Sequence, residues 1–467
     1  MSLLNPKVIE DMRLYGHGLK VVLRKVDNFL PTLGADHLLS GRGGLTRREI
    51  ARHSLNDAEG YDAYSQSLEP VVRTLREWVL RPPPNLGGGI PDMLAALKLG
   101  NDVRRMADEE QRNLLDFFTK SAADILDRYF ETEIVQALFG FDAVVGNYAS
   151  PYDSGSAYVL LHHLFGEAAG VAGAWGHAIG GMGAITQAMA EACRRAGVEI
   201  VLDAPVDEII IEKGGAAGAV AGGKAYRAKA VAAGVGPKLL FGKLLPEGAV
   251  APEIERRMNG WSAESATFRM NVALSELPRF TSLPEPGDHL TAGIIIGPSL
   301  GYMDRAYTSA RAGLWSAEPV VEMLIPSTLD DSLAPAGAHV ASLFCQHFPY
   351  EVEGGWEARV EEAADHVIAH VDRFAPGFKA SVIGRSARSP WHLEQRFGLT
   401  RGDIFHGKMG LDQLFSARPM LGHADYRMPL PGLYLCGSGA HPGGGVTGAP
   451  GHNAARAILA DRKKLRL

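Results

Sequence analysis

A glycine-rich segment near the carboxyl terminus is the part of the sequence whose spacing most clearly suggests chemistry. Six glycines fall between Gly437 and Gly448, after an apolar run at 432–436 and before a helical pattern at 451–464. Glycines just before a helix expose backbone N–H groups at the positive end of the helix dipole, where negative charge is stabilised. A tight turn that needs glycine only for its dihedral angles is the alternative. The number of glycines favours a binding site.

The same segment contains a G-x-G-x-x-G pattern at Gly443, Gly445 and Gly448. A dinucleotide-binding fingerprint also needs a following strand and an acidic residue roughly 20 positions on, and the chain ends before both. Amides at a helix start can instead stabilise the charge that a reduced flavin carries near its N1 atom and C2 carbonyl. The residues expected to bind a flavin here are Gly437, Ser438, Gly439, His441, Pro442, Gly443, Gly444, Gly445, Val446 and Thr447.

Two polar side chains upstream of the glycines are candidates to face the substrate. His406 and Gln413 flank a short glycine-containing stretch just before the segment, so either could lie against the flavin ring; a structural role is the alternative. The sequence identifies no acid–base pair as catalytic, and its cysteine and histidine spacing predicts no metal site. Catalysis by positioning a substrate against a flavin requires no such pair.

A competing motif predicts a different enzyme class. Gly297-Pro-Ser-Leu-Gly matches the G-x-S-x-G elbow of serine hydrolases, with Ser299 as the nucleophile and an apolar run before it. The chain before it is helical and then forms a meander, whereas that hydrolase fold needs alternating strands and helices. The hydrolase interpretation is therefore the less favoured alternative.

Composition and charge limit the partners and the compartment. The 467 residues carry 47 Lys plus Arg against 53 Asp plus Glu, so nothing suggests a nucleic-acid partner. Three cysteines indicate a reducing compartment, and we expect a cytoplasmic protein. No apolar run is long enough for a transmembrane helix, although peripheral membrane contact is compatible with the sequence. The basic tail formed by Arg462, Lys463, Lys464 and Arg466 is interpreted as a solvated helix end, with a membrane or nucleic-acid patch as the alternative.

Hydrophobic periodicity divides the chain into regions that differ in their predicted secondary structure. Residues 45–170 are predicted to be almost wholly helical, with an amphipathic helix over 56–80. A glycine-rich turn at 180–183 then opens a helix whose inner positions are Met182, Ile185 and Met189, and which ends before a glycine C-cap.

Strands are predicted in two regions after that helix. One is a strand followed by an antiparallel meander, and the other is a mixed α+β region with a helix at 358–374. The expected strands cover 198–202, 206–212, 216–221, 224–235, 267–273, 290–296, 320–325, 339–347 and 432–436.

The glycine segment resembles the carboxyl-terminal flavin-binding signature of phytoene-desaturase-like and amine-oxidase-like FAD-dependent oxidoreductases. The closest branch is the one named for a pyridine nucleotide-disulfide oxidoreductase domain, although the chain has no C-x-x-C. Other stretches that resemble the branch are Ser2-Leu-Leu-Asn-Pro, Gly301-Tyr-Met-Asp-Arg-Ala-Tyr, Ile325-Pro-Ser, Ser332-Leu-Ala-Pro, Ile404-Phe-His-Gly, Leu411-Asp-Gln, Ala417-Arg-Pro-Met and Tyr426-Arg-Met-Pro-Leu-Pro-Gly. Gly181-Met-Gly and Ala204-Pro-Val-Asp-Glu-Ile look like the middle FAD segment, which implies that Gly181, Met182 and the backbone of Val206 contact FAD.

The resemblance implies a two-domain flavoprotein, α/β plus α+β, with a Rossmann-like FAD-binding domain built from discontinuous segments and a mixed sheet-and-helix substrate domain. The FAD-binding domain is expected at 171–249 and 426–467, and the substrate domain at 1–170 and 250–425. It also implies hydride transfer from a lipophilic small molecule to FAD, with reoxidation by oxygen, a quinone or another acceptor. The oligomeric state is left open.

Members of the family begin with strand, G-x-G-x-x-G and helix, and nothing before Ser2 supplies that unit. We therefore expect an incomplete Rossmann-like domain, lacking at least about 30 residues of a βαβ unit. A misassigned start, a designed truncation and a shortened natural protein are the three explanations left open. A cofactor-free relic that acts as an interaction or regulatory protein is the alternative function.

Overall fold

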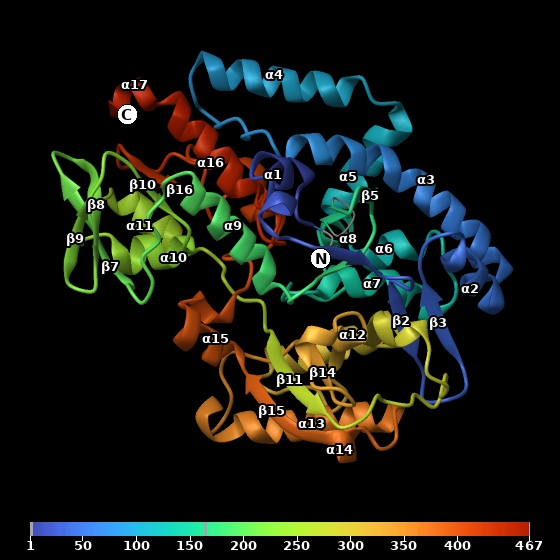
Figure 1. The fold of residues 1–467 in the computed structure, drawn as a ribbon. Helices are drawn as coiled ribbons and strands as arrows, with labels where there is room; N and C mark the ends of the chain where they lie inside the picture. The colour runs from blue at the N-terminus through green and yellow to red at the C-terminus, as the bar shows by residue number, and fades with distance from the viewer. Residues whose placement is uncertain (1–2, 163–165, 467) are drawn as a thin grey trace.

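The computed structural model describes residues 3–162 and 166–466. Figure 1 shows a mixed α/β molecule, as the sequence predicts, and helices from the first third of the chain lie above a sheet region in this view. The helices are α1 (Pro6–Asp11), α2 (Leu45–His53), α3 (Leu55–Trp78), α4 (Ile90–Arg104), α5 (Asp108–Thr119), α6 (Ala122–Leu126), α7 (Glu133–Val144), α8 (Ala157–His162), α9 (Gly183–Arg195), α10 (Pro237–Leu239), α11 (Pro252–Asn259), α12 (Leu300–Arg311), α13 (Trp356–Phe374), α14 (Phe378–Ser381), α15 (Pro390–Phe397), α16 (Ala449–Ala460) and α17 (Arg462–Leu465).

The largest sheet has seven strands in the order β15-β11-β14-β13-β12-β2-β3. The strand β2 runs parallel to β12, and the other neighbours are antiparallel. The strands are β2 (Asn28–Pro31), β3 (His37–Ser40), β11 (Phe268–Leu274), β12 (Gly293–Ile296), β13 (Val320–Leu324), β14 (His339–Gln346) and β15 (Val382–Arg388). One face packs on α13 in a core that includes Phe268, Leu343 and Val367.

The helices α2 to α8 enclose a second core, which confirms the helical prediction for this stretch. The amphipathic α3 begins where the Ser54 side chain accepts a hydrogen bond from the Asp57 amide, and its inner face carries Tyr64, Leu68 and Leu75. Among the described residues, no helix is both long and apolar enough to cross a bilayer.

A third core joins segments about 200 residues apart in the chain. The strand β10 (Val231–Ala233) pairs in parallel with β16 (Leu433–Leu435), and β7 (Val206–Glu212), β8 (Gly215–Ala221) and β9 (Lys224–Arg227) form the expected meander. The predicted run 224–235 is therefore two strands, because its second part pairs with β16 instead of continuing the meander.

The amino-terminal residues pack against the segment that contains α9. Leu4, Val8 and Leu14 share a core with Ile185 and Ala188 of α9. The strand β1 (Val21–Leu23) pairs with β6 (Gly176–Ala178), and β4 (Glu167–Ala168) pairs with β5 (Val171–Ala172). Residues 4–23 thus lie with the segment predicted for the FAD-binding domain; the domain boundaries themselves stay a prediction.

Three expectations about local structure were wrong. Residues 198–202 form no strand: Val198 donates its amide back to Cys193 at the end of α9, and Leu202 is 74% exposed, so the apolar alternation has no neighbouring strand among the described residues. Met182 precedes α9 and is exposed, so it is not an inner position of that helix. The run 290–296 begins as a 3₁₀ turn and is a strand only from Gly293.

Candidate functional site

The glycine loop, residues 437–448, connects β16 to α16. It is held at three points: the amides of Ala440 and Gly443 donate to carbonyls inside the loop, and the carbonyl of Thr447 accepts from the Asn5 amide at 3.0 Å. The amides of Ser438, Gly444, Gly445 and Val446 have no acceptor among the described residues. Unpaired N–H groups grouped before a helix are suited to bind an electron-rich ligand.

Val446 supports a functional role for this loop. Its φ of 58° lies in the left-handed region, which a β-branched residue rarely adopts, and its side chain is 64% exposed. Backbone strain of this kind persists where the surrounding structure enforces it and is concentrated at ligand sites.

A cavity of about 600 Å³ lies against the outer side of the glycine loop; we call it the loop cavity. Its volume falls within the range of sites for small molecules and cofactors. The loop contributes Gly437, Ser438, Gly443, Val446, Thr447 and Gly448, and the remaining lining comes from Val8, Asp11, Met12, Met189, Cys436, Pro450, Gly451, His452, Ala455, Arg456 and Leu459. The Nδ1 atom of His452 lies 3.4 Å from a carboxylate oxygen of Asp11, a contact that joins α16 to α1 at this cavity.

A second cavity of about 550 Å³ lies on the other side of the loop, among the helices; we call it the helix cavity. Its walls are mostly apolar and include Trp78, Leu99, Phe118 and Phe415. His441 of the glycine loop also lines it. The loop therefore separates a cavity beside α16 from an apolar cavity beneath α3, α4 and α5.

The packing of the loop explains several of its glycines without any ligand. A Cβ at Gly444 would lie 2.0 Å from Phe405, one at Gly439 would lie 2.4 Å from Pro237, and one at Gly437 would lie 2.5 Å from a backbone oxygen. The tight-turn interpretation thus accounts for these three positions. The free amides, the strained Val446 and the adjoining cavity carry the argument for a ligand.

Comparison with known proteins identifies the family. Residues 51–262 match the model of flavin containing amine oxidoreductases. The chain is 36% identical to pyridine nucleotide-disulfide oxidoreductase domain-containing protein 2 of Rattus norvegicus, over 100% of this chain and 84% of that protein. It is 26% identical to phytoene desaturase (lycopene-forming) of Pseudescherichia vulneris, over 73% of this chain and 66% of that protein. This chain belongs to the family of pyridine nucleotide-disulfide oxidoreductase domain-containing protein 2.

The fold of this flavin-dependent oxidoreductase agrees with the family assignment. Cyclohexylamine oxidase from Brevibacterium oxydans superposes with a TM-score of 0.55 at 13% identity, over 100% of this chain and 88% of that one. The relic and hydrolase alternatives are not favoured. Ser299 follows β12, but its φ of −157° is ordinary extended backbone, and its hydroxyl accepts from the Tyr302 amide as the N-cap of α12.

The residues around the loop cavity fit a flavin, because free amides adjoin a space of suitable volume. Of the thirteen residues predicted to bind the cofactor, Gly437, Ser438, Gly443, Val446 and Thr447 line this cavity. Gly439, Pro442 and Gly444 are buried in the protein, and Gly445 is partly buried. Gly181, Met182 and Val206 lie at the turn before α9 and at the start of β7, outside the cavity lining.

Arg418 holds the glycine loop from beneath, and the sequence did not point to it as a functional residue. Its side chain is fully buried and donates hydrogen bonds to five backbone carbonyls, those of Phe405, Gly407, Lys408, Gln413 and Ser438. Burial lowers the pKa of Arg418 to about 10, so the guanidinium stays charged at neutral pH. Its position in the quoted Ala417-Arg-Pro-Met stretch was the available signal.

Of the two substrate-facing candidates beside this network, Gln413 is buried and His406 is half-buried. The side-chain oxygen of Gln413 accepts from the Ser262 amide at 2.6 Å, and its nitrogen donates to the Ser262 carbonyl at 2.8 Å. These two hydrogen bonds give Gln413 a structural role. His406 packs near Gly236 and Trp261 outside both cavities, and burial lowers its pKa to about 4. The structure thus brings neither into the wall of the loop cavity or the helix cavity.

His441 does reach a cavity wall. Its Nε2 atom lies 3.2 Å from the carbonyl oxygen of Trp78, to which it donates, and its ring packs at 5.3 Å from that of Phe415. Burial lowers the pKa of His441 to about 4, so the ring is neutral at pH 7. The neutral ring joins the glycine loop to the last turn of α3.

Proposed function

We propose that this protein is an FAD-dependent oxidoreductase that takes hydride from a C–H or C–N bond of a lipophilic small molecule. The observation that carries the proposal is the glycine loop between two cavities, one bordered by free amides and the other apolar. A flavin ring in the loop cavity and an apolar substrate approaching from the helix cavity would meet at this loop. The family membership supplies the reaction class.

When bound, the flavin would supply the acceptor for the hydride, which carries both electrons of the oxidation. The amides of Ser438 and Val446 are suited to hold the negative charge that follows, because they border the loop cavity, are fixed before the reaction and have no other acceptor among the described residues. Arg418 keeps the Ser438 carbonyl of the loop turned inward. The apolar rings of Trp78 and Phe118 exclude water from the substrate side.

The full dinucleotide is part of the proposal. In an extended FAD the adenosine end would continue from the loop cavity toward α9 and the start of β7. Gly181, Met182 and the Val206 backbone are exposed or half-exposed there, and Met189 of the same helix already borders the loop cavity. We therefore retain these three residues as the proposed adenosine-side contacts.

The electron acceptor and the cellular compartment are also part of the proposal. Oxygen, a quinone or another acceptor would reoxidise the flavin from the open side of the loop cavity. The three cysteines are free thiols, which is the state kept in the cytoplasm. The expected partners are a small lipophilic substrate and this acceptor, without nucleic acid.

The test is the visible absorption spectrum of the purified protein. We expect a flavin spectrum in the 467-residue chain, or in a version extended upstream to the next start codon, and bleaching of that spectrum under anaerobic conditions by a substrate from a lipophilic screen. Absence of flavin from both proteins, even after reconstitution with FAD, would overturn the proposal. The variant Val446→Gly, which relieves the strain, serves as a probe of the loop without adding bulk.

A further inference from the structure

Helix α4 presents an apolar face to solvent. It contains no buried residue along its fifteen residues. Ile90, Met93, Leu94 and Leu97 are 70, 55, 58 and 63% exposed, and their spacing places them on one face of the helix. Leu86, in the loop just before α4, is 62% exposed. Contiguous apolar surface of this kind marks a binding surface, because it is unfavourable in water.

The other face of α4 covers the helix cavity. Ala95, Leu99 and Val103 line that cavity, whose far wall includes His441 of the glycine loop. Figure 1 shows α4 as a separate helix along the upper edge of the molecule, joined to α3 and α5 by loops. Helix α4 therefore lies between solvent and an apolar cavity, with apolar side chains toward both.

Among the described residues, the basic side chains of α4 are not paired with its acidic side chains. Asp92 accepts a hydrogen bond from the Asn85 amide at 2.9 Å, and Asp102 pairs with Arg81 at 2.9 Å. Lys98, Arg104 and Arg105 are exposed, and in the part of the chain that the structure describes they form no ion pair. Lys98, Arg104 and Arg105 thus outnumber Asp92, whose hydrogen bond to a neutral amide leaves its negative charge in place.

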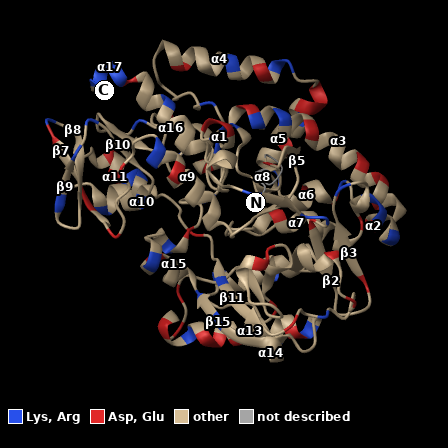
Figure 2. Cartoon of the chain, in the orientation of Figure 1, with Lys and Arg blue, Asp and Glu red and all other residues tan. Residues whose placement is uncertain are grey.

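A second group of cations belongs to the end of the chain. Arg462, Lys463, Lys464 and Arg466 of the terminal α17 segment are exposed, and Figure 2 shows them as a blue cluster at the same edge of the molecule as α4. Among these, Lys464 pairs with Asp461.

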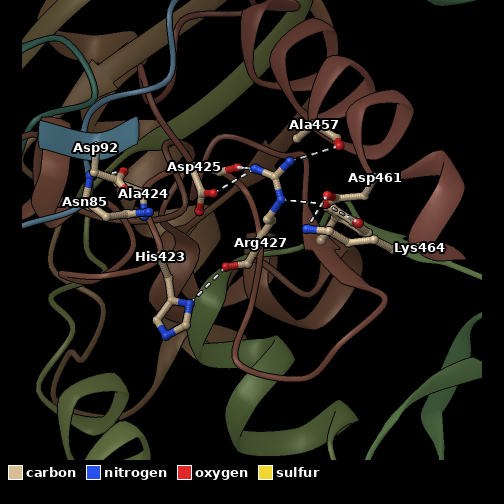
Figure 3. Close-up of polar contacts among 10 residues, drawn as sticks. Asn85, Asp92, His423, Ala424, Asp425, Arg427, Ala457, Asp461 and Lys464 are labelled. Carbon is tan, nitrogen blue, oxygen red and sulfur yellow. Dashed lines mark hydrogen bonds and ion pairs between the residues drawn. The ribbon is translucent and has the colours of Figure 1, made fainter. Parts of the chain in front are cut away.

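Polar contacts connect α17 to α4 (Figure 3). Asn85 binds Asp92 of α4 and accepts from the Ala424 amide, and Arg427, close along the chain, pairs with Asp425 and Asp461. The basic segment and the apolar helix are therefore parts of one surface.

We propose that the α4–α17 surface, formed by Leu86, Ile90, Met93, Leu94 and Leu97 with the cations of α4 and α17, docks on the anionic face of a lipid bilayer. Apolar residues on one helical face next to clustered Lys and Arg are the pattern of an interfacial helix, in which the leucines enter the acyl boundary and the cations bind lipid phosphates. Fifteen residues span about 22 Å, too short to cross a bilayer, so α4 would lie in its plane.

Charge complementarity favours an anionic bilayer as the occupant, because lipid phosphates can bind the cations of α17 and those of α4 at the same time. The acidic residues Asp108, Glu109 and Glu110 open α5, beyond the opposite end of α4 from α17. The α17 cations thus lie toward the end of α4 that carries Ile90 and Met93, whereas Arg104 and Arg105 lie toward the acidic end.

Docking in this position has a consequence that rests on the proposed function. The helix cavity lies directly beneath α4, so a lipophilic substrate dissolved in the bilayer would reach it without crossing water. The docking itself requires neither flavin nor substrate, and it can therefore be tested independently of the enzymatic reaction.

Co-sedimentation of the full chain with vesicles tests the proposal. We expect binding to phosphatidylcholine vesicles that contain phosphatidylglycerol, much weaker binding to phosphatidylcholine alone, and weakening by salt. The double variant Leu94→Ser/Leu97→Ser should lower the partition coefficient by about tenfold for each leucine. The double variant Lys463→Glu/Arg466→Glu should abolish the preference for anionic vesicles.

Matched controls distinguish specific binding through this surface from nonspecific adsorption to vesicles. Leu314 and Ile383 are 61 and 65% exposed and lie outside the α4–α17 surface, so Leu314→Ser and Ile383→Ser should leave vesicle binding unchanged. Equal loss in these controls, or absence of binding to anionic vesicles at low salt, would overturn the proposal. A solution dimer that Leu94→Ser/Leu97→Ser dissociates would assign the surface to a second copy instead. Flavin content, measured on every variant, reports separately on the proposed function.

Discussion

The guanidinium of Arg418 donates two hydrogen bonds to the carbonyl oxygen of Ser438, at 2.6 and 3.0 Å, from a position with no exposure to solvent. This contact turns the Ser438 carbonyl into the protein, away from the loop cavity, so that the amides on the cavity side remain as donors. Because the same guanidinium also binds carbonyls of the 405–413 segment, one side chain sets the relative position of both segments.

Replacement of Arg418 by lysine should release the glycine loop. Lysine keeps the positive charge but cannot reproduce the fork of donors, so several buried carbonyls lose their partner. We expect a loss of about 3 kcal/mol in the free energy of unfolding, measured by urea denaturation, together with a lower flavin content. The exposed Arg256→Lys is the matched control and should change neither quantity. Normal stability in Arg418→Lys would show that the network is dispensable.

Replacement of Gly444 by alanine tests the packing of the loop. The added Cβ would lie 2.0 Å from the ring of Phe405, so the loop must shift. We expect destabilisation of about 2 kcal/mol. The double variant with Phe405→Leu should recover part of this loss, and a double-mutant cycle measures the coupling. Gly100→Ala, where the new methyl meets open space in α4, should instead raise stability by about 0.5 kcal/mol.

Much of the fold could be predicted from the sequence because local patterns and structure agree. Neighbouring residues determine the hydrophobic period of α3, and they also determine the meander turns at Gly214-Gly215 and Gly222-Gly223. The structure contains this helix and these turns. The strand predicted at 198–202 was wrong because a strand depends on residues that are distant in the sequence. A strand is stabilised by its neighbour, and the sequence of Val198 to Leu202 alone cannot specify one.

The site was predictable in part. The glycine loop could be identified because its glycines are consecutive in sequence and precede a helix. Arg418 and the α1 side chains at the loop cavity are brought there by tertiary packing, and local spacing carries no signal for such contacts. The α16 residues His452, Arg456 and Leu459 follow a helical period, so their common face could have been found.

Stability should depend on pH through Asp330, which links the loop after β13 to the turn before α9. Desolvation would raise its pKa, but donors from Ser332, Gly180 and His177 outweigh that effect and lower the pKa to about 2. A depressed carboxyl pKa contributes stability above the unfolded value, and this contribution is lost as pH falls from about 4 to about 2. Asp330→Asn should therefore cost about 2 kcal/mol at neutral pH and progressively less in that acidic window.

The acid-dependent part of this cost distinguishes charge from shape. Asparagine keeps the size and an acceptor, so a cost that is constant with pH would assign the effect to geometry alone. The exposed neighbour Asp331→Asn is the matched control, and its free energy of unfolding should follow that of the wild-type protein.

Filling the helix cavity should impair catalysis without loss of flavin. Leu99 projects into this cavity, and the larger ring in Leu99→Trp would occupy space beneath α4. We expect the rate of anaerobic flavin reduction by a lipophilic substrate to fall about tenfold or more, while flavin absorbance per protein stays unchanged. Leu314→Trp, on the exposed surface, is the control. Unchanged reduction in Leu99→Trp would show that substrate reaches the flavin by another route.

Substitutions at Ser299 distinguish an N-cap from a nucleophile. The hydroxyl accepts from the Tyr302 amide at 3.2 Å, so Ser299→Ala should cost about 1 kcal/mol in unfolding free energy, whereas Ser299→Asp should retain the cap and most of the stability. Both variants remove the hydroxyl that a hydrolase would need. Because Ser299 lines neither the loop cavity nor the helix cavity, flavin reduction should proceed at the wild-type rate in Ser299→Asp. Ester hydrolysis by the wild-type protein that both substitutions abolish would instead restore the hydrolase interpretation.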